Sequence, residues 1–274
     1  MSIVLINIAG FFSNFLKVLD WKLCQPDKKI IPYFIDRGYH FRNNYYLDTN
    51  IYPEKQNIWY ILFETEHEFI DTDILFFDTE YPTSGHPFPI NIFHKEYIFC
   101  LSSIYSNEHF DEIRRLYNNI FKELKWTPFL TQTINSLKLP NKTLAAMIRA
   151  PVHYQNVDNN FFEEILTELD VLLKDYDYLY LVTQVKEYQD IIINKYQNRV
   201  LYLKNKNMVE NFIDWTVNDA DYKKECIDCF LDVYLASTCD FLIGGSSNMM
   251  LGALFINPKQ QFKIFDCLKD NNGY

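Results

Sequence analysis

A short run of small and polar residues near the carboxyl end of the chain has the composition of an anion-binding turn. It follows the apolar segment 239–243 and consists of Gly244, Gly245, Ser246, Ser247 and Asn248. If a helix begins here, its N-terminus offers unpaired N–H groups, and the glycines let a ligand approach the backbone closely. The run therefore predicts a diphosphate site. A plain helix cap is the alternative, because Ser and Asn are frequent N-cap residues and the run matches neither a P-loop nor GxGxxG.

Arg149 is a second candidate for binding an anion. It lies at the carboxyl end of the segment 142–150, which we expect to be a strand, shortly before Pro151. Parallel strands end at the same edge of a sheet, so Arg149 would share a rim with the run 246–248. A guanidinium opposite a helix N-terminus would hold a diphosphate from two sides. The alternative for this residue is an ordinary exposed arginine.

The first half of the chain contains the elements of a βαβ unit. The run 2–8 is expected to be a strand, the spacing of apolar residues over 11–24 predicts a helix, and 28–36 reads as a second strand. The runs 57–64 and 73–79 are interpreted as strands or short buried segments. An amphipathic helix is expected over 107–126, with helical continuation to residue 138.

After the break at Leu139-Pro140-Asn141 the chain alternates between strands and helices, which favours a parallel sheet with helices on its faces. The expected strands are 142–150, 178–184, 199–203, 239–245 and 262–266. The expected helices between them are 161–176, 185–197, 223–238 and one that starts within 246–256. We therefore predict an α/β protein of two facing Rossmann-like domains, residues 1–140 and 141–274.

Composition excludes several classes of protein. The formal net charge of −10 gives no global basic footprint for nucleic acid. No apolar run is long enough for a transmembrane helix and the N-terminus lacks a basic signal-peptide region, so we expect a cytoplasmic protein. With 23 Phe and 20 Tyr, the core should be unusually aromatic. The single CxxC motif, Cys226 to Cys229, could serve zinc or redox chemistry, but two half-buried thiols on a helix are the preferred interpretation.

The segment 232–254, DVYLASTCDFLIGGSSNMMLGAL, resembles a motif of the GT-B glycosyltransferases of the fucosyltransferase-like group, which includes nodulation, core α1,6, α1,2 and protein O-fucosyltransferases. LAAMIRAPVHY (144–154) is similar to the family strand that carries the essential arginine. The order of 10–19, 30–36 and 57–64 resembles the N-terminal acceptor domain of viral and bacterial members. The resemblance implies the GT-B fold and a sugar transfer from a nucleotide-sugar donor, with GDP-fucose preferred, to a hydroxyl of a glycan or glycoprotein.

Site residues follow from the same resemblance. Arg149 would grip the β-phosphate, the run 246–248 would bind the diphosphate, and Asp232 would contact the base or the ribose. Gly10 would face the cleft from the other domain. The family arginine is usually preceded, two residues earlier, by His and followed by a second Arg, whereas this chain has Met147 and Ala150. The difference leaves another GDP-sugar, or a UDP-sugar such as UDP-xylose, open.

The implied reaction is direct displacement at the anomeric carbon without a metal cofactor, the arginine and the helix N-terminus neutralising the leaving group. Asp36 and His153 are candidates for the group that takes the acceptor proton. One competing hypothesis is a metal-dependent GT-A enzyme that uses Asp71-Thr72-Asp73. Another is a non-catalytic glycan-binding protein with a degenerate transferase fold.

Overall fold

The computed structural model forms two compact units. One comprises Met1–Leu137 with Val217–Phe230, and the other comprises Lys138–Thr216 with Leu231–Tyr274. The described residues are 2–6, 11–33, 58–64, 74–77, 108–148, 161–206, 208 and 222–265. Helix α8 (Tyr222–Ser237) contributes its first nine residues to the first unit and the remainder to the second.

The first unit contains a small parallel sheet. Its strands are β1 (Ser2–Ile6), β2 (Lys29–Tyr33) and β3 (Ile74–Phe77), in the order β2-β1-β3, and both pairs run parallel. Helix α1 (Phe11–Cys24) connects β1 to β2, so the βαβ unit expected from the sequence is confirmed. Pro32 lies in β2, which is at the edge of the three described strands, a position that tolerates a missing N–H donor.

Three helices of the first unit differ in detail from the sequence expectation. The run 57–64 contains a short helix, α2 (Ile58–Leu62), with Ile58, Trp59 and Leu62 buried. The long helical stretch divides into α4 (Phe110–Glu123) and α5 (Pro128–Ser136). The division occurs where Thr127 caps α5, its hydroxyl accepting a hydrogen bond from the Leu130 N–H, with Pro128 at the first helical position.

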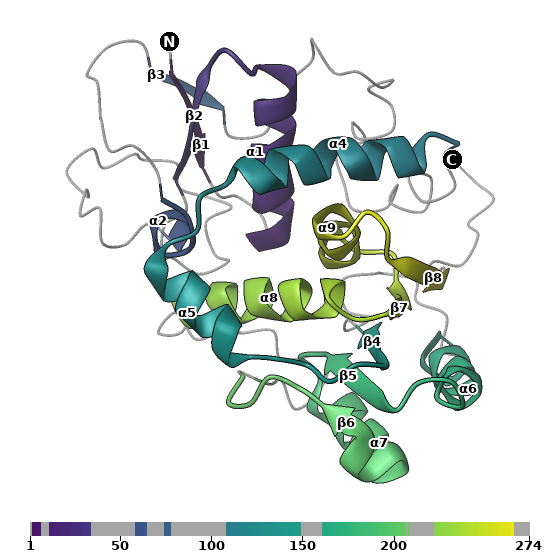
Figure 1. The fold of residues 1–274 in the computed structure, drawn as a ribbon. Helices are drawn as coiled ribbons and strands as arrows, with labels where there is room; N and C mark the ends of the chain where they lie inside the picture. Colours follow the sequence, from purple (N-terminus) through teal and green to yellow (C-terminus); the bar gives the residue numbers. More distant parts are fainter. Residues whose placement is uncertain are drawn as a thin grey trace, which may run out of the picture. The chain divides into compact units, whose positions relative to one another are not determined.

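An aromatic cluster forms the core of the first unit, as the composition predicts. Phe15 on α1 is fully buried and contacts six other rings, which belong to Phe11, Phe12, Trp59, Phe63, Phe121 and Phe230. The same helix packs against α4 (Figure 1), where the Tyr117 hydroxyl donates to Asp20. Edge and offset ring contacts add to the stabilisation from area burial, so this cluster fixes the position of α1.

The second unit contains a five-stranded sheet in which every pair of neighbours is parallel. Its strands are β4 (Thr143–Met147), β5 (Tyr178–Val182), β6 (Val200–Leu201), β7 (Phe241–Gly245) and β8 (Gln261–Phe265). The spatial order is β6-β5-β4-β7-β8. After β4 the chain adds β5 and β6 on one side of that strand, crosses back, and adds β7 and β8 on its other side. This order confirms the doubly wound sheet predicted from the sequence.

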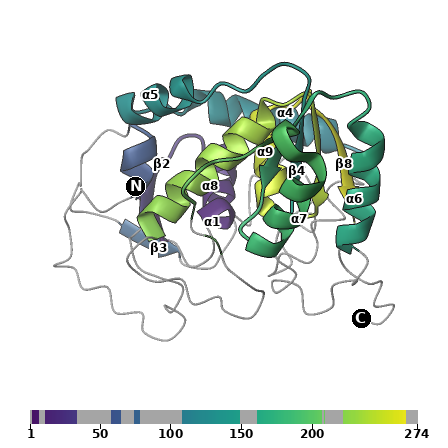
Figure 2. The same cartoon turned by 90° about the horizontal axis from the view of Figure 1, so that it is seen from below.

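The helices of the second unit cover both faces of its sheet. In Figures 1 and 2, α6 (Phe161–Leu172) and α7 (Lys186–Tyr196) lie on one side and α9 (Asn248–Ile256) lies on the other. The change of side occurs between β4 and β7, the neighbouring strands from which the chain departs in opposite directions. In open α/β sheets this topological switch point leaves a crevice at the carboxyl ends of the strands, where ligands bind.

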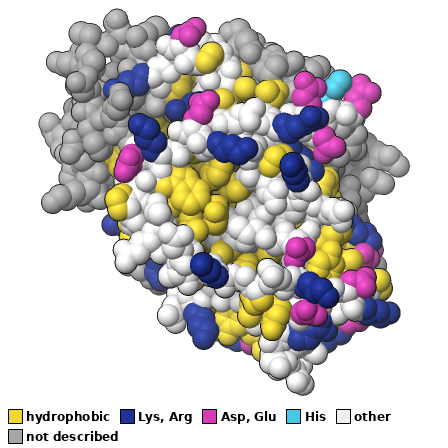
Figure 3. Space-filling view, in the orientation of Figure 1, with side chains coloured by type: hydrophobic (Ala, Val, Ile, Leu, Met, Phe, Trp, Pro, Cys, Tyr) yellow, Lys and Arg dark blue, Asp and Glu magenta, His cyan; other side chains and the backbone are white. Residues whose placement is uncertain are grey.

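The described surface carries charges of both signs. In Figure 3, Lys and Arg side chains lie beside Asp and Glu over α4, so no field of one sign forms there. None of the described helices has the length and apolar content that a membrane crossing requires. Cys226 is buried and Cys229 half-buried, and both lie on α8, the helix on which the preferred interpretation of the CxxC motif placed them.

Candidate functional site

The candidate site lies at the carboxyl ends of β4 and β7, at the switch point of the second unit. The two strands are neighbours in register, and Met147 near the end of β4 pairs with Gly244 near the end of β7. Immediately after β7, the chain passes through Ser246 and Ser247 into α9, which begins at Asn248. The run 244–248 therefore occupies the strand-to-helix turn that the sequence predicted.

Gly244 has a packing function in this turn. A Cβ atom at this position would lie 2.4 Å from the carbonyl oxygen and 3.1 Å from the Cβ of Met147. Real Cβ atoms do not approach backbone oxygens so closely, so a side chain here would push β4 and β7 apart. The absence of a side chain at Gly244 keeps the two strands close at the switch point. The sequence had suggested a different reason for this glycine, the close approach of a ligand to the backbone.

Ser247 is the N-cap of α9. Its backbone is extended, and its hydroxyl accepts a hydrogen bond from the Met250 N–H at 3.1 Å. The helix-cap interpretation is therefore correct for this residue. Ser246 and Ser247 are both buried, with 2 % of each exposed. The cap satisfies the Met250 N–H, while the dipole of α9 keeps a partial positive charge at the switch point.

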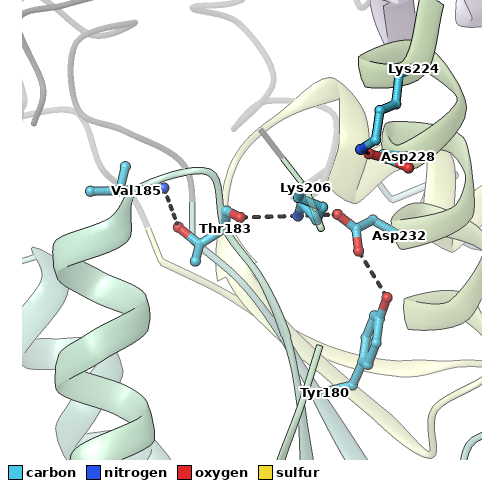
Figure 4. A network of polar contacts seen from close by, with 7 residues as sticks. All are labelled: Tyr180, Thr183, Val185, Lys206, Lys224, Asp228 and Asp232. Atoms are coloured by element: carbon cyan, nitrogen blue, oxygen red, sulfur yellow. Dashed lines mark hydrogen bonds and ion pairs between the residues drawn. The ribbon is translucent and has the colours of Figure 1, made fainter. Parts of the chain in front are cut away.

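A buried polar network lies beside this rim, centred on Asp232 of α8 (Figure 4). The Asp232 side chain is 1 % exposed. Its Oδ1 accepts a hydrogen bond of 2.8 Å from the Tyr180 hydroxyl on β5, and its Oδ2 forms an ion pair with Lys206. A buried carboxylate of this kind requires compensation, and here both of its oxygens have a protein partner.

Lys206 ties this network to the end of β5. Its Nζ donates to the Thr183 carbonyl oxygen at 3.0 Å, and its side chain is 7 % exposed. The Thr183 hydroxyl in turn accepts from the Val185 N–H at 3.2 Å, at the start of α7. Thr183 follows the last residue of β5, and Lys206 follows β6. Since parallel strands end at one edge of a sheet, the network lies at the same edge as the β7–α9 turn.

Of the ten site residues predicted from the sequence, the structure describes six, all in the second unit: Asp232 on α8 and the other five in the β7–α9 turn. They are Asp232, Gly244, Gly245, Ser246, Ser247 and Asn248. The other four lie outside the described residues: Gly10, Asp36, Arg149 and His153. Their roles remain predictions, as does the Asp71-Thr72-Asp73 alternative, which also lies outside. Across the described part of the chain, His, Cys, Asp and Glu form no group of three that could hold a metal ion.

Lys206 was not predicted from the sequence as a site residue, although it pairs with Asp232 at this edge of the sheet. It lies within the run Lys204-Asn205-Lys206, which reads as an ordinary charged loop. Its partner Asp232 is 26 residues away along the chain, and only the parallel sheet brings the two together. Local sequence carries no sign of this pairing.

No protein-family model matches the sequence, and no curated protein is similar to it. Solved structures do match in fold. The NodZ α-1,6-fucosyltransferase in crystals soaked with GDP-fucose is 11 % identical, with a TM-score of 0.54 over 97 % of this chain and 94 % of that one. Fucosyltransferase NodZ from Bradyrhizobium is 12 % identical, with a TM-score of 0.50 over 92 % of each chain. The apo form of POFUT1 matches at a lower TM-score, 0.47, with 9 % identity over 96 % of this chain and 97 % of that one. The chain therefore has the α/β GT-B fold of the NodZ structures, as its resemblance to fucosyltransferases implied.

Proposed function

We propose that this chain is a glycosyltransferase that moves a sugar from a GDP-sugar, with GDP-fucose as the first donor to test, to a hydroxyl of a glycan or glycoprotein acceptor. The observation that carries the proposal is the position of the β7–α9 turn. It places a capped helix N-terminus at the switch point of a parallel sheet, in a chain that shares its fold with NodZ. Such a turn suits a diphosphate, because the helix dipole favours negative charge there.

The roles proposed for individual residues follow this geometry. The N-terminus of α9, with Ser246, Ser247 and Asn248, binds the diphosphate, and Gly244 and Gly245 shape the turn. Arg149 follows β4, which ends beside β7, and its guanidinium contacts the β-phosphate. As the bond at the anomeric carbon breaks, these positive groups neutralise the charge that develops on the leaving GDP.

The nucleoside half of the donor is assigned to the end of β5, the strand whose Tyr180 contacts Asp232. Gly10 is assigned to the acceptor-side domain, residues 1–140, and faces the donor from there. Asp36 or His153 takes the proton from the acceptor hydroxyl as the new glycosidic bond forms. Arg149 and the N-terminus of α9 are assigned the stabilisation of the leaving group that a divalent metal ion provides in some transferases, so no cofactor is assigned to the reaction.

A GDP-sugar other than GDP-fucose is the second candidate donor. In the fucosyltransferase-like group that the sequence resembles, a His usually lies two residues before the arginine. This chain has Met147 there, which is 2 % exposed and packs beside Gly244. A buried thioether offers no strong hydrogen bond to a donor sugar. The hydroxyl pattern recognised by this chain could therefore differ from that of fucose.

Nucleotide binding measured by calorimetry tests the proposal most directly. GDP should bind more tightly than UDP or CDP, and GDP-fucose should be consumed when a glycan acceptor is present. The Arg149→Ala variant should lose GDP affinity, because truncating one partner of a hydrogen-bonded charge pair costs about 2–5 kcal/mol. Arg115→Ala is the matched control, since Arg115 is exposed on α4 and its Nε donates to the Asp111 carbonyl oxygen. Unchanged GDP affinity in Arg149→Ala would refute the assignment of the diphosphate site.

A further inference from the structure

Lys206 is a buried cation that has more donors than protein acceptors. An ammonium group has three N–H donors. Among the described residues, Lys206 has two acceptors, the Thr183 carbonyl oxygen and the Asp232 carboxylate. With 93 % of its side chain buried, the remaining N–H is poorly placed to be satisfied by bulk water, and an unsatisfied buried donor is costly.

The position of Lys206 indicates what its remaining donor would meet. Its Nζ lies at the carboxyl end of β5, which is the neighbour of β4 on the side away from β7. Adjacent strands are about 5 Å apart, so the ammonium lies roughly 5–10 Å from the ends of β4 and β7. The diphosphate is proposed to bind at the β7–α9 turn, and β5 lies two strands away from β7. A donor group that reaches the end of β5 therefore belongs to another part of the nucleotide than the diphosphate.

We propose that Lys206 donates a hydrogen bond to the nucleoside half of the bound nucleotide, an inference that rests on the proposed donor site. Asp232 then acts as the counter-ion that seats Lys206. Both Asp232 oxygens already have protein partners, one in Tyr180 and the other in Lys206. The direct contact to base or ribose therefore comes from the lysine, and the carboxylate positions it.

The test separates the two halves of the ligand by calorimetry with GDP and with inorganic diphosphate. Lys206→Met alone would leave the Asp232 carboxylate buried without its counter-ion, which is strongly destabilising. The lysine and its counter-ion are therefore removed together in an Asp232→Asn, Lys206→Met double variant, where the amide oxygen can still accept from Tyr180. The comparison is between the unaltered protein and this double variant, with folding checked by circular dichroism. Lys195→Met is the control, because Lys195 pairs with Asp170 on the surface.

We expect the double variant to bind GDP about 10- to 100-fold more weakly than the unaltered protein, the usual effect of a charge-assisted hydrogen bond. Both proteins should bind inorganic diphosphate equally, and Lys206→Arg should retain most of the GDP affinity. Equal GDP affinities in the two proteins would overturn the proposal. An equal loss of GDP and diphosphate affinity would also overturn it, since the lysine would then serve the diphosphate. If the unaltered protein bound diphosphate but no nucleotide, the proposed function itself would fail.

Discussion

Gly244 on β7 and Met147 on β4 lie so close that a Cβ on the glycine would be 2.4 Å from the methionine carbonyl oxygen. The oxygen belongs to the backbone of a buried central strand and cannot move aside as the end of a side chain could. The contact is at the switch point, so any adjustment would change the spacing of the two strands from which the candidate site is built.

Gly244→Ala should therefore destabilise the protein by about 1–3 kcal/mol, the usual cost of forcing an extra carbon into a packed interior. The free energy of unfolding from urea denaturation measures this effect. Gln261→Ala on β8 is a suitable control, because Gln261 is exposed in the same sheet and should change stability by less than about 0.5 kcal/mol. Equal stability of Gly244→Ala and the unaltered protein would show that β4 can shift freely.

Substitutions at Ser247 should separate the helix cap from the binding of the ligand. Ser247→Ala removes the hydrogen bond to the Met250 N–H and should cost about 0.5–2 kcal/mol of stability. Ser247→Asp keeps an N-cap acceptor but places a carboxylate at a position that is 2 % exposed, so its folding is checked by circular dichroism before GDP affinity is measured. The same aspartate places a negative charge where the diphosphate is proposed to bind, so GDP affinity should fall sharply. A stable Ser247→Asp variant with unchanged GDP affinity would place the diphosphate elsewhere.

Stability should decline at alkaline pH because two buried acids keep their protons in the folded state. Burial, and secondarily Asp20, raises the pKa of Cys24 from 9.0 to about 12. Burial, and secondarily Glu187, raises the pKa of Tyr188 from 10.0 to about 12. Well below pH 9 both groups are protonated in the folded and the unfolded state, so neither group makes the free energy of unfolding depend on pH there. As the pH rises toward 12, the unfolded chain loses these protons first, and each group lowers the free energy of unfolding by up to about 1.4 kcal/mol per pH unit.

Urea denaturation between about pH 9 and 11 checks this expectation. The Cys24→Ala variant should show a shallower decline in the free energy of unfolding than the unaltered protein, because one of the titrating groups has been removed. Parallel curves would mean that the Cys24 thiol ionises as readily in the folded protein as in the unfolded chain.

Removal of divalent metal ions should leave sugar transfer nearly unchanged. In the proposed site, the charge on the leaving GDP is met by Arg149 and the N-terminus of α9, so the reaction has no step that requires a metal. Transfer from GDP-fucose to a glycan acceptor can be measured with and without EDTA. Loss of activity with EDTA and recovery with Mn²⁺ would favour a DxD site such as Asp71-Thr72-Asp73.

The sequence predicts the second unit better than the first. Its strands and helices alternate with clear periods, and the run 244–248 marks the strand-to-helix turn. The helix at Ile58–Leu62 was ambiguous because a short apolar run has no period that separates a strand from a buried helical turn. The break between α4 and α5 ends at Thr127-Pro128. This pair is identified as the start of a new helix only when the geometry of the cap is known. The pairing of Lys206 with Asp232 depends on tertiary contacts and cannot be read from local sequence.

The register of β4 with β7 has a consequence for how the protein is made. Hydrogen bonds join Thr143 to Asp240, 97 residues later, and the intervening chain includes β5, β6 and three helices. Pairings of such high sequence separation form slowly, because the entropy of closing the loop is lost before the contacts are gained. The switch point cannot exist until the ribosome has released residues 241–245, so a shorter chain would lack the proposed donor site. Nucleotide binding would therefore report that folding is complete, and would stabilise only chains that have reached that stage.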